Sequence, residues 1–332
     1  MRSNSGRTTV VITGASAGVG RALALKFARM GARVALIGRL AEGLESTKCE
    51  IESFGGEALT FPLDVSDADA VRHAADEVSE RWGGIDIWVN DAMLTMFSPL
   101  TEMSPEEFRR ITEVTYLGCV HGTMAALKHM RPQSAGTIIQ IGSALSYRAI
   151  PLQSAYCGAK SAIRACTDAL RSELIHEGSN IRLMMAQLPA VNTPQFNWAR
   201  NRFSRRPQPL PPVYEPEVIA DAIYAALSDP PRELWIGWPT LKLIAGAIAL
   251  PGFLDRYLAR KAYEQQFTDE PASPDGRGNL FEPGAPDEHM TRGRFSSRSY
   301  RHAVAVNPNA VRIGVAGTLL FLLAAALLGR RL

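Results

Sequence analysis

The chain has 332 residues, of which 46% are hydrophobic and 21% charged, and 36 basic against 33 acidic side chains give a net charge of +3. This composition fits a globular protein with a sizeable core and excludes a wholly disordered chain, a fibre and a polytopic membrane protein. The small net charge gives no electrostatic reason to expect a nucleic-acid partner. Cys49, Cys119, Cys157 and Cys166 form no Cys-x-x-Cys pair, so neither a metal site nor a disulfide framework is predicted.

The N-terminal residues 1–9 are polar and predict no secretory signal. From residue 10 to about 237, short apolar runs alternate with longer segments of helical periodicity. Buried strands that alternate with helices predict an α/β domain over residues 1–240, with a doubly wound parallel sheet. The expected strands are 10–13, 34–37, 58–61, 85–89, 137–141, 181–187 and 233–236. The expected helices are 18–30, 40–54, 67–82, 105–130, 154–177 and 215–228.

The sequence changes character after residue 240. Residues 241–263 form an apolar to amphipathic appendage, with a turn or helix expected at 253–263. Residues 264–310 are rich in Pro, Gly, Asp, Ser and Arg, and with little apolar surface to bury they are predicted to be a disordered linker.

The last segment, 311–332, contains a run of 17 uncharged residues at 313–329. As an apolar helix this run would span about 26 Å, close to the hydrocarbon thickness of a thin bilayer. We therefore expect a C-terminal membrane anchor. Two alternatives stay open: a helix docked on another subunit, and an interfacial helix, although Thr318 alone gives no polar face. A soluble cytoplasmic protein is the alternative location.

A glycine-rich turn lies between the first expected strand and the first expected helix. Glycines allow a close backbone approach there, and the helix N-terminus offers N–H groups and a positive dipole end to a pyrophosphate. Such a turn alone is as often only a tight turn, but its strand–turn–helix context favours dinucleotide binding. The candidate cofactor-binding residues of this turn are Thr13, Gly14, Ser16, Gly18, Val19 and Gly20.

Two further positions bear on the adenosine half of the dinucleotide. The second strand ends in Gly38-Arg39, which lacks the carboxylate that accepts from an NAD ribose, whereas Arg39 can pair with a 2′-phosphate. NADP is therefore favoured over NAD, unless Arg39 is simply a solvated arginine at the start of a helix. Asp64 and Val65 follow the third strand and would lie beside the adenine, although Asp64 could equally cap the next helix.

A third group of residues points to acid–base chemistry. Tyr156 and Lys160 are four residues apart on one expected helix and share a face of it. A nearby ammonium stabilises a phenolate and lowers the tyrosine pKa. Ser143 follows the fifth strand, at the sheet edge where such folds bind ligands, and can hold a substrate oxygen while Tyr156 exchanges a proton with it.

Over roughly residues 8–240 the chain resembles the short-chain dehydrogenase/reductase family. The motifs that carry the resemblance are the sequence TGASAGVG, Asp64-Val65, the strand end Asn90-Asp91-Ala92, Ser143 and Tyr156-x-x-x-Lys160. It implies a Rossmann-like fold, a nicotinamide cofactor, reversible oxidation of an alcohol to a ketone or aldehyde, and a homo-oligomer.

The resemblance also assigns roles to single residues. Tyr156 would be the acid/base, and Lys160 would lower its pKa and bind the nicotinamide ribose. Asn90 would support the sheet and the cofactor site. Pro189 and Thr193 would contact the cofactor, Thr193 through the nicotinamide carboxamide.

If the C-terminal segment anchors the protein in a membrane, the supply of NADP places the catalytic domain on the cytosolic side.

The chain departs from the family pattern at three places. Met93 stands where the strand-end motif has glycine, Ala190 follows Pro189 in place of glycine, and Thr115 takes the position of an asparagine that holds a water in the proton relay. A threonine hydroxyl can still hold a water, so Thr115 is kept as a catalytic candidate. A rival hypothesis follows from Met93 and Thr115: a catalytically weak dinucleotide-binding scaffold or sensor at a membrane.

The substrate side is expected in a lid at residues 191–212. Phe196, Trp198 and Phe203 lie there among arginines and prolines. They indicate a bulky hydrophobic alcohol or ketone, unless they only pack the lid onto the sheet. The main hypothesis is an NADP-preferring oxidoreductase for such a substrate.

Overall fold

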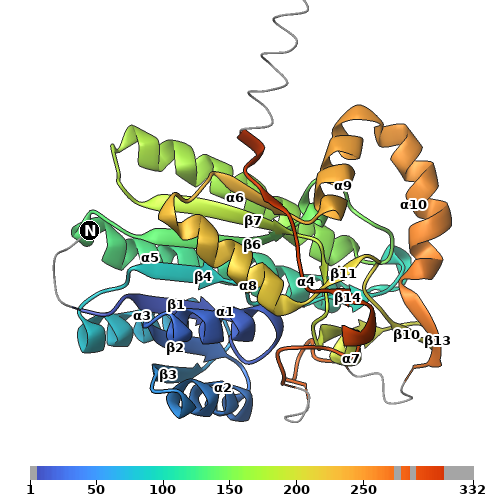
Figure 1. Ribbon diagram of the computed structural model, residues 1–332. Coiled ribbons are helices and arrows are strands. Elements are labelled where there is room, and N and C mark those ends of the chain that lie inside the picture. Colours follow the sequence, from blue (N-terminus) through green and yellow to red (C-terminus); the bar gives the residue numbers. More distant parts are fainter. Residues whose placement is uncertain (1–5, 273–277, 285–288, 310–332) are drawn as a thin grey trace, which may run out of the picture.

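A computed structural model describes residues 6–272, 278–284 and 289–309. Within these ranges the main sheet has eight strands in the order β15-β12-β7-β6-β4-β1-β2-β3 (Figure 1). Neighbours pair in parallel except for β15, which runs antiparallel to β12. The strands are β1 (Thr9–Thr13), β2 (Arg33–Gly38), β3 (Glu57–Pro62), β4 (Ile87–Asn90), β6 (Thr137–Ser143), β7 (Arg182–Leu188), β12 (Glu233–Ile236) and β15 (Ala305–Val306). The predicted α/β fold with a parallel sheet is confirmed.

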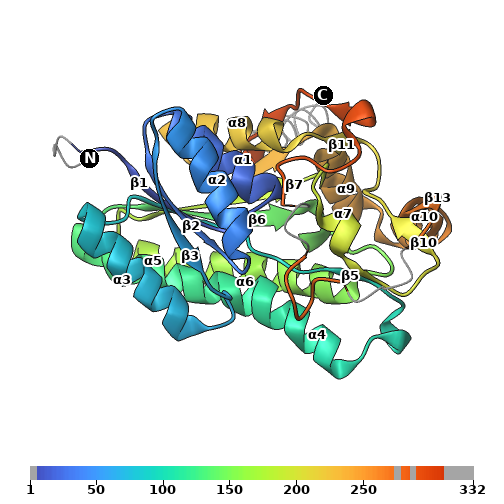
Figure 2. The same ribbon diagram turned by 90° about the horizontal axis from the view of Figure 1, so that it is seen from below.

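Helices cover both faces of this sheet (Figure 2). One layer contains α1 (Gly18–Arg29), α2 (Ala41–Ser53) and α8 (Pro216–Ala225). The other contains α3 (Ala68–Trp82), α4 (Pro105–Thr112), α5 (Gly118–Gln133) and α6 (Ser154–His176). Because the central strands β1, β4 and β6 lie between two helical layers, they are buried almost throughout.

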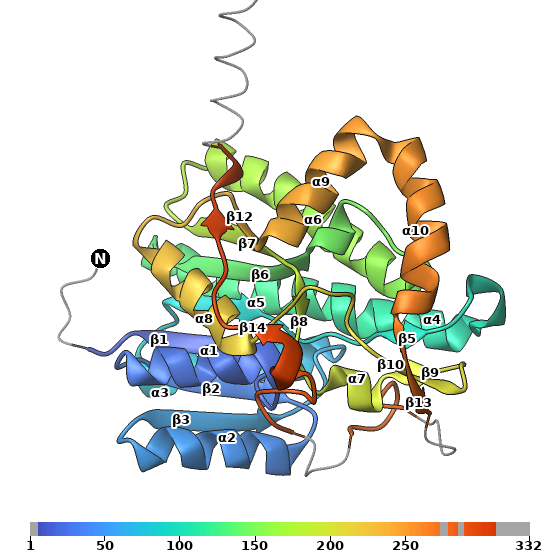
Figure 3. The same cartoon turned by 45° about the vertical axis from the view of Figure 1, so that its right-hand side comes forward.

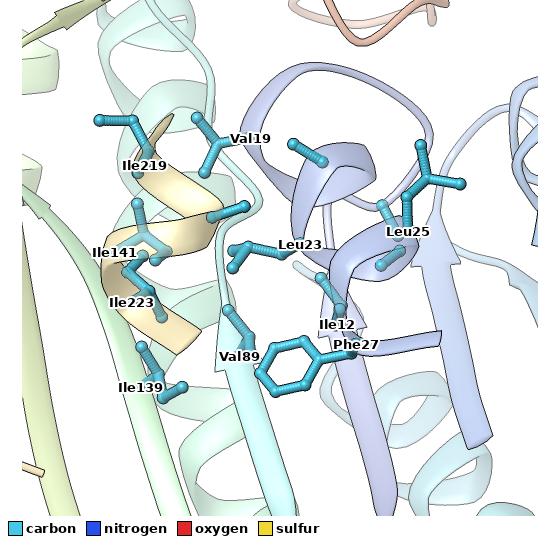
Figure 4. Packing of buried hydrophobic residues seen from close by; sticks show 14 of the residues in the cluster. Ile12, Val19, Leu23, Leu25, Phe27, Val89, Ile139, Ile141, Ile219 and Ile223 are labelled. Atoms are coloured by element: carbon cyan, nitrogen blue, oxygen red, sulfur yellow. The ribbon is translucent and has the colours of Figure 1, made fainter. Parts of the chain in front are cut away.

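The core between α1, α8 and the sheet shows why α1 forms where it does. Val19, Leu23 and Phe27 recur every fourth residue and therefore form one apolar stripe. This stripe packs against Ile219 and Ile223 of α8 over the central strands (Figure 4). Burial of each such side chain stabilises the fold by roughly 1.5–3 kcal/mol, which fixes the glycine-rich turn that precedes α1.

The segment 105–130, expected as one helix, is interrupted. A π-helical turn at Glu113–Leu117 separates α4 from α5. Such turns insert a residue into the helical register and are frequent at functional sites. Here the turn carries Thr115 toward the loop after β4, and Gly118 approaches Val65 so closely that a Cβ would lie 2.5 Å from its side chain.

Beyond β12 the chain forms a helical hairpin. Its arms are α9 (Trp238–Ala249) and α10 (Pro251–Gln265), and it leans over the carboxyl end of the sheet (Figure 3). The expected helix at 253–263 is therefore confirmed within α10. Leu258 and Ala262 of α10 pack against Ile150 and Cys157 below them.

The prediction of a disordered linker at 264–310 is wrong for the residues that the structure describes there. β13 (Phe267–Pro271) pairs with β10 (Arg205–Pro207), β14 (Ser299–Tyr300) pairs with β11 (Val213–Tyr214), and β15 extends the main sheet. Phe267, Leu280 and Phe295 are buried. The segment is ordered because it packs on the rest of the domain. A few of its apolar side chains are buried there, and its backbone pairs with strands of the domain, so it needs no core of its own.

The predicted C-terminal helix at 313–329 lies outside the described residues. Among the helices that the structure does describe, none has the length and apolar character needed to cross a bilayer.

Candidate active site

A cavity of about 570 Å³ lies at the carboxyl ends of the central strands, between the sheet, the α9–α10 hairpin and the C-terminal segment. Twelve of the predicted site residues line it: Gly14, Ser16, Gly18, Val19, Arg39, Asp64, Val65, Ser143, Tyr156, Lys160, Pro189 and Thr193. The fold therefore brings to one cavity residues that are up to 179 positions apart in the sequence, Gly14 and Thr193.

The glycine-rich turn is shaped by two close approaches. Gly14 has a φ of +73°, and a Cβ there would lie 2.9 Å from the Ala92 nitrogen. A Cβ on Gly20 would lie 2.3 Å from the Gly14 carbonyl oxygen. Side chains at either position would push the turn out of the cavity, so both glycines keep the N-terminus of α1 at the cavity wall.

Thr13 and Asn90 hold the strand ends behind this wall. The Thr13 hydroxyl accepts from the backbone N–H groups of Asp91 and Ala92, at 3.0 and 3.1 Å. The Asn90 amide donates to Gln140 and Thr123, at 2.9 and 3.1 Å. The Thr13 bonds tie β1 to the end of β4, and the buried Asn90 bonds tie β4 to β6 and to α5. A role of Asn90 at the cofactor site stays a prediction.

Ser143 and Tyr156 meet at the catalytic end of the cavity. Ser143 is the last residue of β6 and is 7% exposed, and its hydroxyl accepts from the Leu145 N–H at 3.1 Å. Ser143 and Tyr156 of α6 both line the cavity. Burial raises the pKa of Tyr156 above its usual range, while the Ser143 hydroxyl opposes that rise. The Tyr156 hydroxyl therefore keeps its proton at neutral pH.

Lys160 lies one turn further along α6 and is almost fully buried. Its Nζ donates to the Ile141 carbonyl oxygen at 2.6 Å and lies 5.7 Å from the centre of the Tyr156 ring. Burial lowers the pKa of Lys160, and Asp91 opposes that shift. The expected lowering of the tyrosine pKa by Lys160 stays a prediction, because burial sets the direction of the Tyr156 pKa shift and Cys157 and Asp91 raise it further.

Asp91 is a titratable residue that the sequence revealed only as part of a strand-end motif. Burial raises its pKa from 3.8 to about 7, against the opposing effects of Lys160 and of the Gly20 backbone N–H. The carboxyl group thus lies between the glycine-rich turn and the lysine. Its half-buried position follows from the tertiary fold and has no local sequence signal.

Thr115 occupies a different environment from the one expected. It is fully buried, and its hydroxyl donates to the Leu94 carbonyl at 3.2 Å and accepts from the Leu94 N–H at 2.9 Å. The side chain thereby fixes the turn that contains Met93. A water-holding role for Thr115 stays a prediction.

Asp64 and Arg39 line the part of the cavity where the sequence predicts the adenosine half of the dinucleotide. Asp64 accepts from the N–H and the hydroxyl of Ser66 and forms an ion pair with Arg110. Burial raises the pKa of Asp64, but the bonds from Arg110 and Ser66 outweigh it and keep the carboxyl ionised. The alternative that Asp64 caps the next helix is wrong, because Asp67 caps α3.

The substrate side combines residues that were predicted and residues that were not. Of the three lid aromatics, Phe196 and Trp198 line the cavity, whereas Phe203 packs on Phe267 with 4.5 Å between ring centres. Apolar side chains near Tyr156 complete this end: Leu145, Ile150, Leu210, Leu254 and Leu258. The two from α10 lie outside the motif-bearing region, so only the fold could reveal them.

Comparison with known proteins identifies the family. Residues 8–202 match the family model described as short chain dehydrogenase. The chain belongs to the short-chain dehydrogenase family. It is thus an oxidoreductase of the kind that acts on CH–OH groups, and proteins of this family bind NAD(P).

Individual relatives agree with this assignment. An uncharacterized oxidoreductase of Bacillus subtilis, YxnA, is 29% identical over 93% of this chain and 88% of its own length. A short-chain dehydrogenase from Streptomyces avermitilis, 24% identical, shares the fold with a TM-score of 0.66 over 78% of this chain and 98% of its own. An alcohol dehydrogenase from the archaeon Thermococcus sibiricus, solved with 5-hydroxy-NADP, is 30% identical with a TM-score of 0.58, over 69% of this chain and 95% of its own.

Proposed function

We propose that this member of the family is an NADP-preferring oxidoreductase that interconverts a bulky hydrophobic alcohol with its ketone or aldehyde. The observation that carries the proposal is that Ser143, Tyr156 and Lys160, the last two one helical turn apart, line the same cavity as the glycine-rich turn. The proposed catalytic residues are these three, with Thr115 as a supporting candidate.

The residues present fit a dinucleotide. Gly14 and Gly20 allow a tight turn that side chains at these positions would disrupt. The turn and the N-terminus of α1 line the cavity, where backbone N–H groups can bind a pyrophosphate. Gly18, Val19 and Ser16 would bind the pyrophosphate and the adjoining ribose, Asp64 and Val65 the adenine, and Thr193 and Pro189 the nicotinamide end. Arg39 supports NADP over NAD because its planar guanidinium matches a 2′-phosphate. The 5-hydroxy-NADP of the Thermococcus enzyme is in keeping with this choice.

The bound nicotinamide supplies or accepts the hydride. In the direction of reduction, the Tyr156 hydroxyl donates its proton to the substrate oxygen while the Ser143 hydroxyl holds that oxygen. In the direction of oxidation, the Tyr156 phenolate accepts the alcohol proton. Because burial holds the tyrosine protonated, reduction is favoured near neutral pH and oxidation requires more alkaline conditions.

The substrate class rests on the lining near Tyr156. Leu145, Ile150 and Leu210 there are joined by Leu254 and Leu258 of the hairpin, so the reacting oxygen enters a mainly apolar space. An apolar ketone larger than acetone would bury more of its surface and bind more tightly.

A ketone panel with NADPH tests the proposal. We expect Tyr156→Phe to lower kcat by about 10²–10⁴-fold, since it removes the proton donor, with dinucleotide affinity retained. Tyr224→Phe, a half-buried tyrosine on α8, is the matched control and should keep full activity. Turnover that is equal in Tyr156→Phe and wild type would favour the scaffold hypothesis, and tighter binding of NADH than of NADPH would exclude the proposed preference.

The membrane anchor at 313–329 stays a separate sequence-based proposal. Deletion of residues 311–332 followed by cell fractionation tests it. A shift from the membrane to the supernatant fraction is expected, and an unchanged distribution would contradict the anchor.

A further inference from the structure

The C-terminal part of the chain covers the adenosine end of the cavity. Residues 278–284 and 289–300, here called the strap, run beside α7 (Gln195–Trp198) and past the glycine-rich turn (Figure 3, orange-red). The Asn279 N–H donates to the Trp198 carbonyl at 2.9 Å, and the His289 ring stacks on Trp198 with 4.8 Å between ring centres. The strap is therefore in direct contact with the proposed cofactor site.

The strap uses the arginine that the 2′-phosphate would need. Arg39 donates through Nη2 to the Asn279 carbonyl at 2.6 Å and through Nη1 to the Leu280 carbonyl at 3.2 Å. Both terminal nitrogens of the guanidinium are thus directed at strap oxygens. A 2′-phosphate would bind through the same fork.

The strap also uses a donor that the pyrophosphate would need. The Gly18 N–H, at the first turn of α1, donates to the Met290 carbonyl at 3.0 Å. Beside it, Arg21 donates through Nη1 to the His289 carbonyl at 2.7 Å. Strap carbonyl oxygens therefore stand at the helix N-terminus where an anion would be held.

One apolar side chain anchors the first part of the strap. Leu280 is fully buried and packs in the cluster that contains Val65, the residue expected beside the adenine. Arg110, which is paired with Asp64, donates through Nε to the Leu280 carbonyl at 2.9 Å. The next residue, Phe281, is 56% exposed, so the anchoring depends on Leu280.

The second part of the strap is fixed to the lid. Asn192 accepts from the Phe295 N–H at 3.0 Å and donates to the Ser296 hydroxyl at 2.9 Å. Phe295 is 5% exposed and meets Phe196 edge-on at 5.9 Å. The strap thus connects the adenosine end of the cavity to the substrate lid.

We propose that the strap competes with the adenosine half of the dinucleotide for Arg39 and the Gly18 N–H, so that cofactor binding displaces it. This rests on the proposed cofactor site. Only molecules with the strap undocked can bind the dinucleotide. The apparent dissociation constant for the dinucleotide therefore equals the intrinsic constant divided by the fraction of undocked molecules. NADP(H), which has a 2′-phosphate for Arg39, displaces the strap more completely than NAD(H).

The first experiment weakens the anchor. Leu280→Ser should lower the dissociation constant for NADPH by about tenfold or more, since loss of a buried leucine favours the undocked strap. Phe281→Ser, its exposed neighbour, is the matched control and should bind NADPH like the wild type. Unchanged or weaker NADPH binding in Leu280→Ser would overturn the competition.

The second experiment needs no variant and therefore holds even if Leu280→Ser folds poorly. Hydrogen exchange of the wild-type chain is followed at 278–284 and 289–300, with and without saturating NADPH or NADH. We expect faster exchange with NADPH and a smaller increase with NADH. Slower exchange with NADPH would show that the strap closes over a bound cofactor and would overturn the proposal.

The two experiments separate this inference from the proposed function. If NADPH binds and the ketones turn over while exchange in the strap is unchanged, competition is wrong and the oxidoreductase assignment stands. If neither wild type nor Leu280→Ser binds NADPH or NADH, the proposed cofactor site fails, and the competition fails with it.

Discussion

The catalytic end of the cavity is built on regular secondary structure, whereas its adenosine end is closed by a segment with little of it. Ser143 ends a central strand, and Tyr156 and Lys160 lie on the 23-residue helix α6. At the other end, the strap is fixed by single buried side chains such as Leu280 and by carbonyl oxygens that accept from Arg39 and Arg110.

The difference indicates that the two ends have different mechanical properties. Strand ends and α6 are held by the cooperative core, so they open only when much of the domain unfolds. The strap is held by two buried side chains, Leu280 and Phe295, and by hydrogen bonds from arginines. Each of these hydrogen bonds contributes little net free energy, because water can replace the strap carbonyl that accepts it. A rigid catalytic end beside a replaceable cover suits a protein that must bind and release a large cofactor.

The largest effect should come from the core that supports the rigid end. Leu23→Ala removes a fully buried side chain from the contact of α1 with α8 and should lower the free energy of unfolding by roughly 2–5 kcal/mol. Urea denaturation checks this. Ile175, 73% exposed near the end of α6, is the control, and its change to alanine should have little effect. Equal losses would mean that α1 is not part of a cooperative core.

The next effect concerns Asp91, beneath the rigid end. Its carboxyl has a pKa of about 7 when folded and an ordinary value of 3.8, so the folded state holds the proton more tightly. The resulting stability is fully present below pH 4 and is lost as the pH rises to 7. Asp91→Asn should lack this slope and gain on the order of 3 kcal/mol relative to the wild type between pH 4 and 7. Parallel stability curves for the two proteins would contradict the buried carboxyl.

A smaller effect on overall stability should come from the strap itself. Phe295→Ala removes a buried ring that contacts Phe196 in a small cluster separate from the two large cores, so we expect local opening before global unfolding. Limited proteolysis within 289–300 should become faster while the urea midpoint falls less than for Leu23→Ala. If the urea midpoint fell as far as in Leu23→Ala, the strap would unfold together with the core, and the two ends of the cavity would not differ in local stability.

The smallest effect should be at α4, the helix that connects the two regions through Arg110. Ser104 caps α4, accepting from the Glu107 N–H at 3.3 Å, and Glu107 returns a bond to the Ser104 N–H. Ser104→Ala should cost about 1 kcal/mol in thermal unfolding. Thr112→Ala at the other end of the helix is the control, since its hydroxyl donates only within the helix. No change in Ser104→Ala would mean that the cap adds nothing to α4.

Much of the rigid end could be predicted because its signals are local. The glycine-rich turn, the strand ends and the four-residue spacing of Tyr156 and Lys160 each depend on neighbours in the chain, and hydrophobic periodicity placed them on the correct elements. The π-helical turn at Thr115 had no such signal, because helical periodicity continues through it. The Thr115 hydroxyl is therefore hydrogen-bonded to the Leu94 backbone, a contact that the sequence did not predict.

The strap could not be predicted because its order is not a property of its own composition. A segment with few apolar residues stays disordered when it must form its own core, but here Leu280 and Phe295 enter a core that other segments have already built. The sequence by itself determined the parallel sheet, the glycine-rich turn and the spacing of Tyr156 and Lys160, all of which follow from local periodicity and steric limits. Only the tertiary structure decided that Asp91 is half-buried near Lys160 and that Arg39 is engaged by the strap, because burial and pairing between distant segments arise from packing.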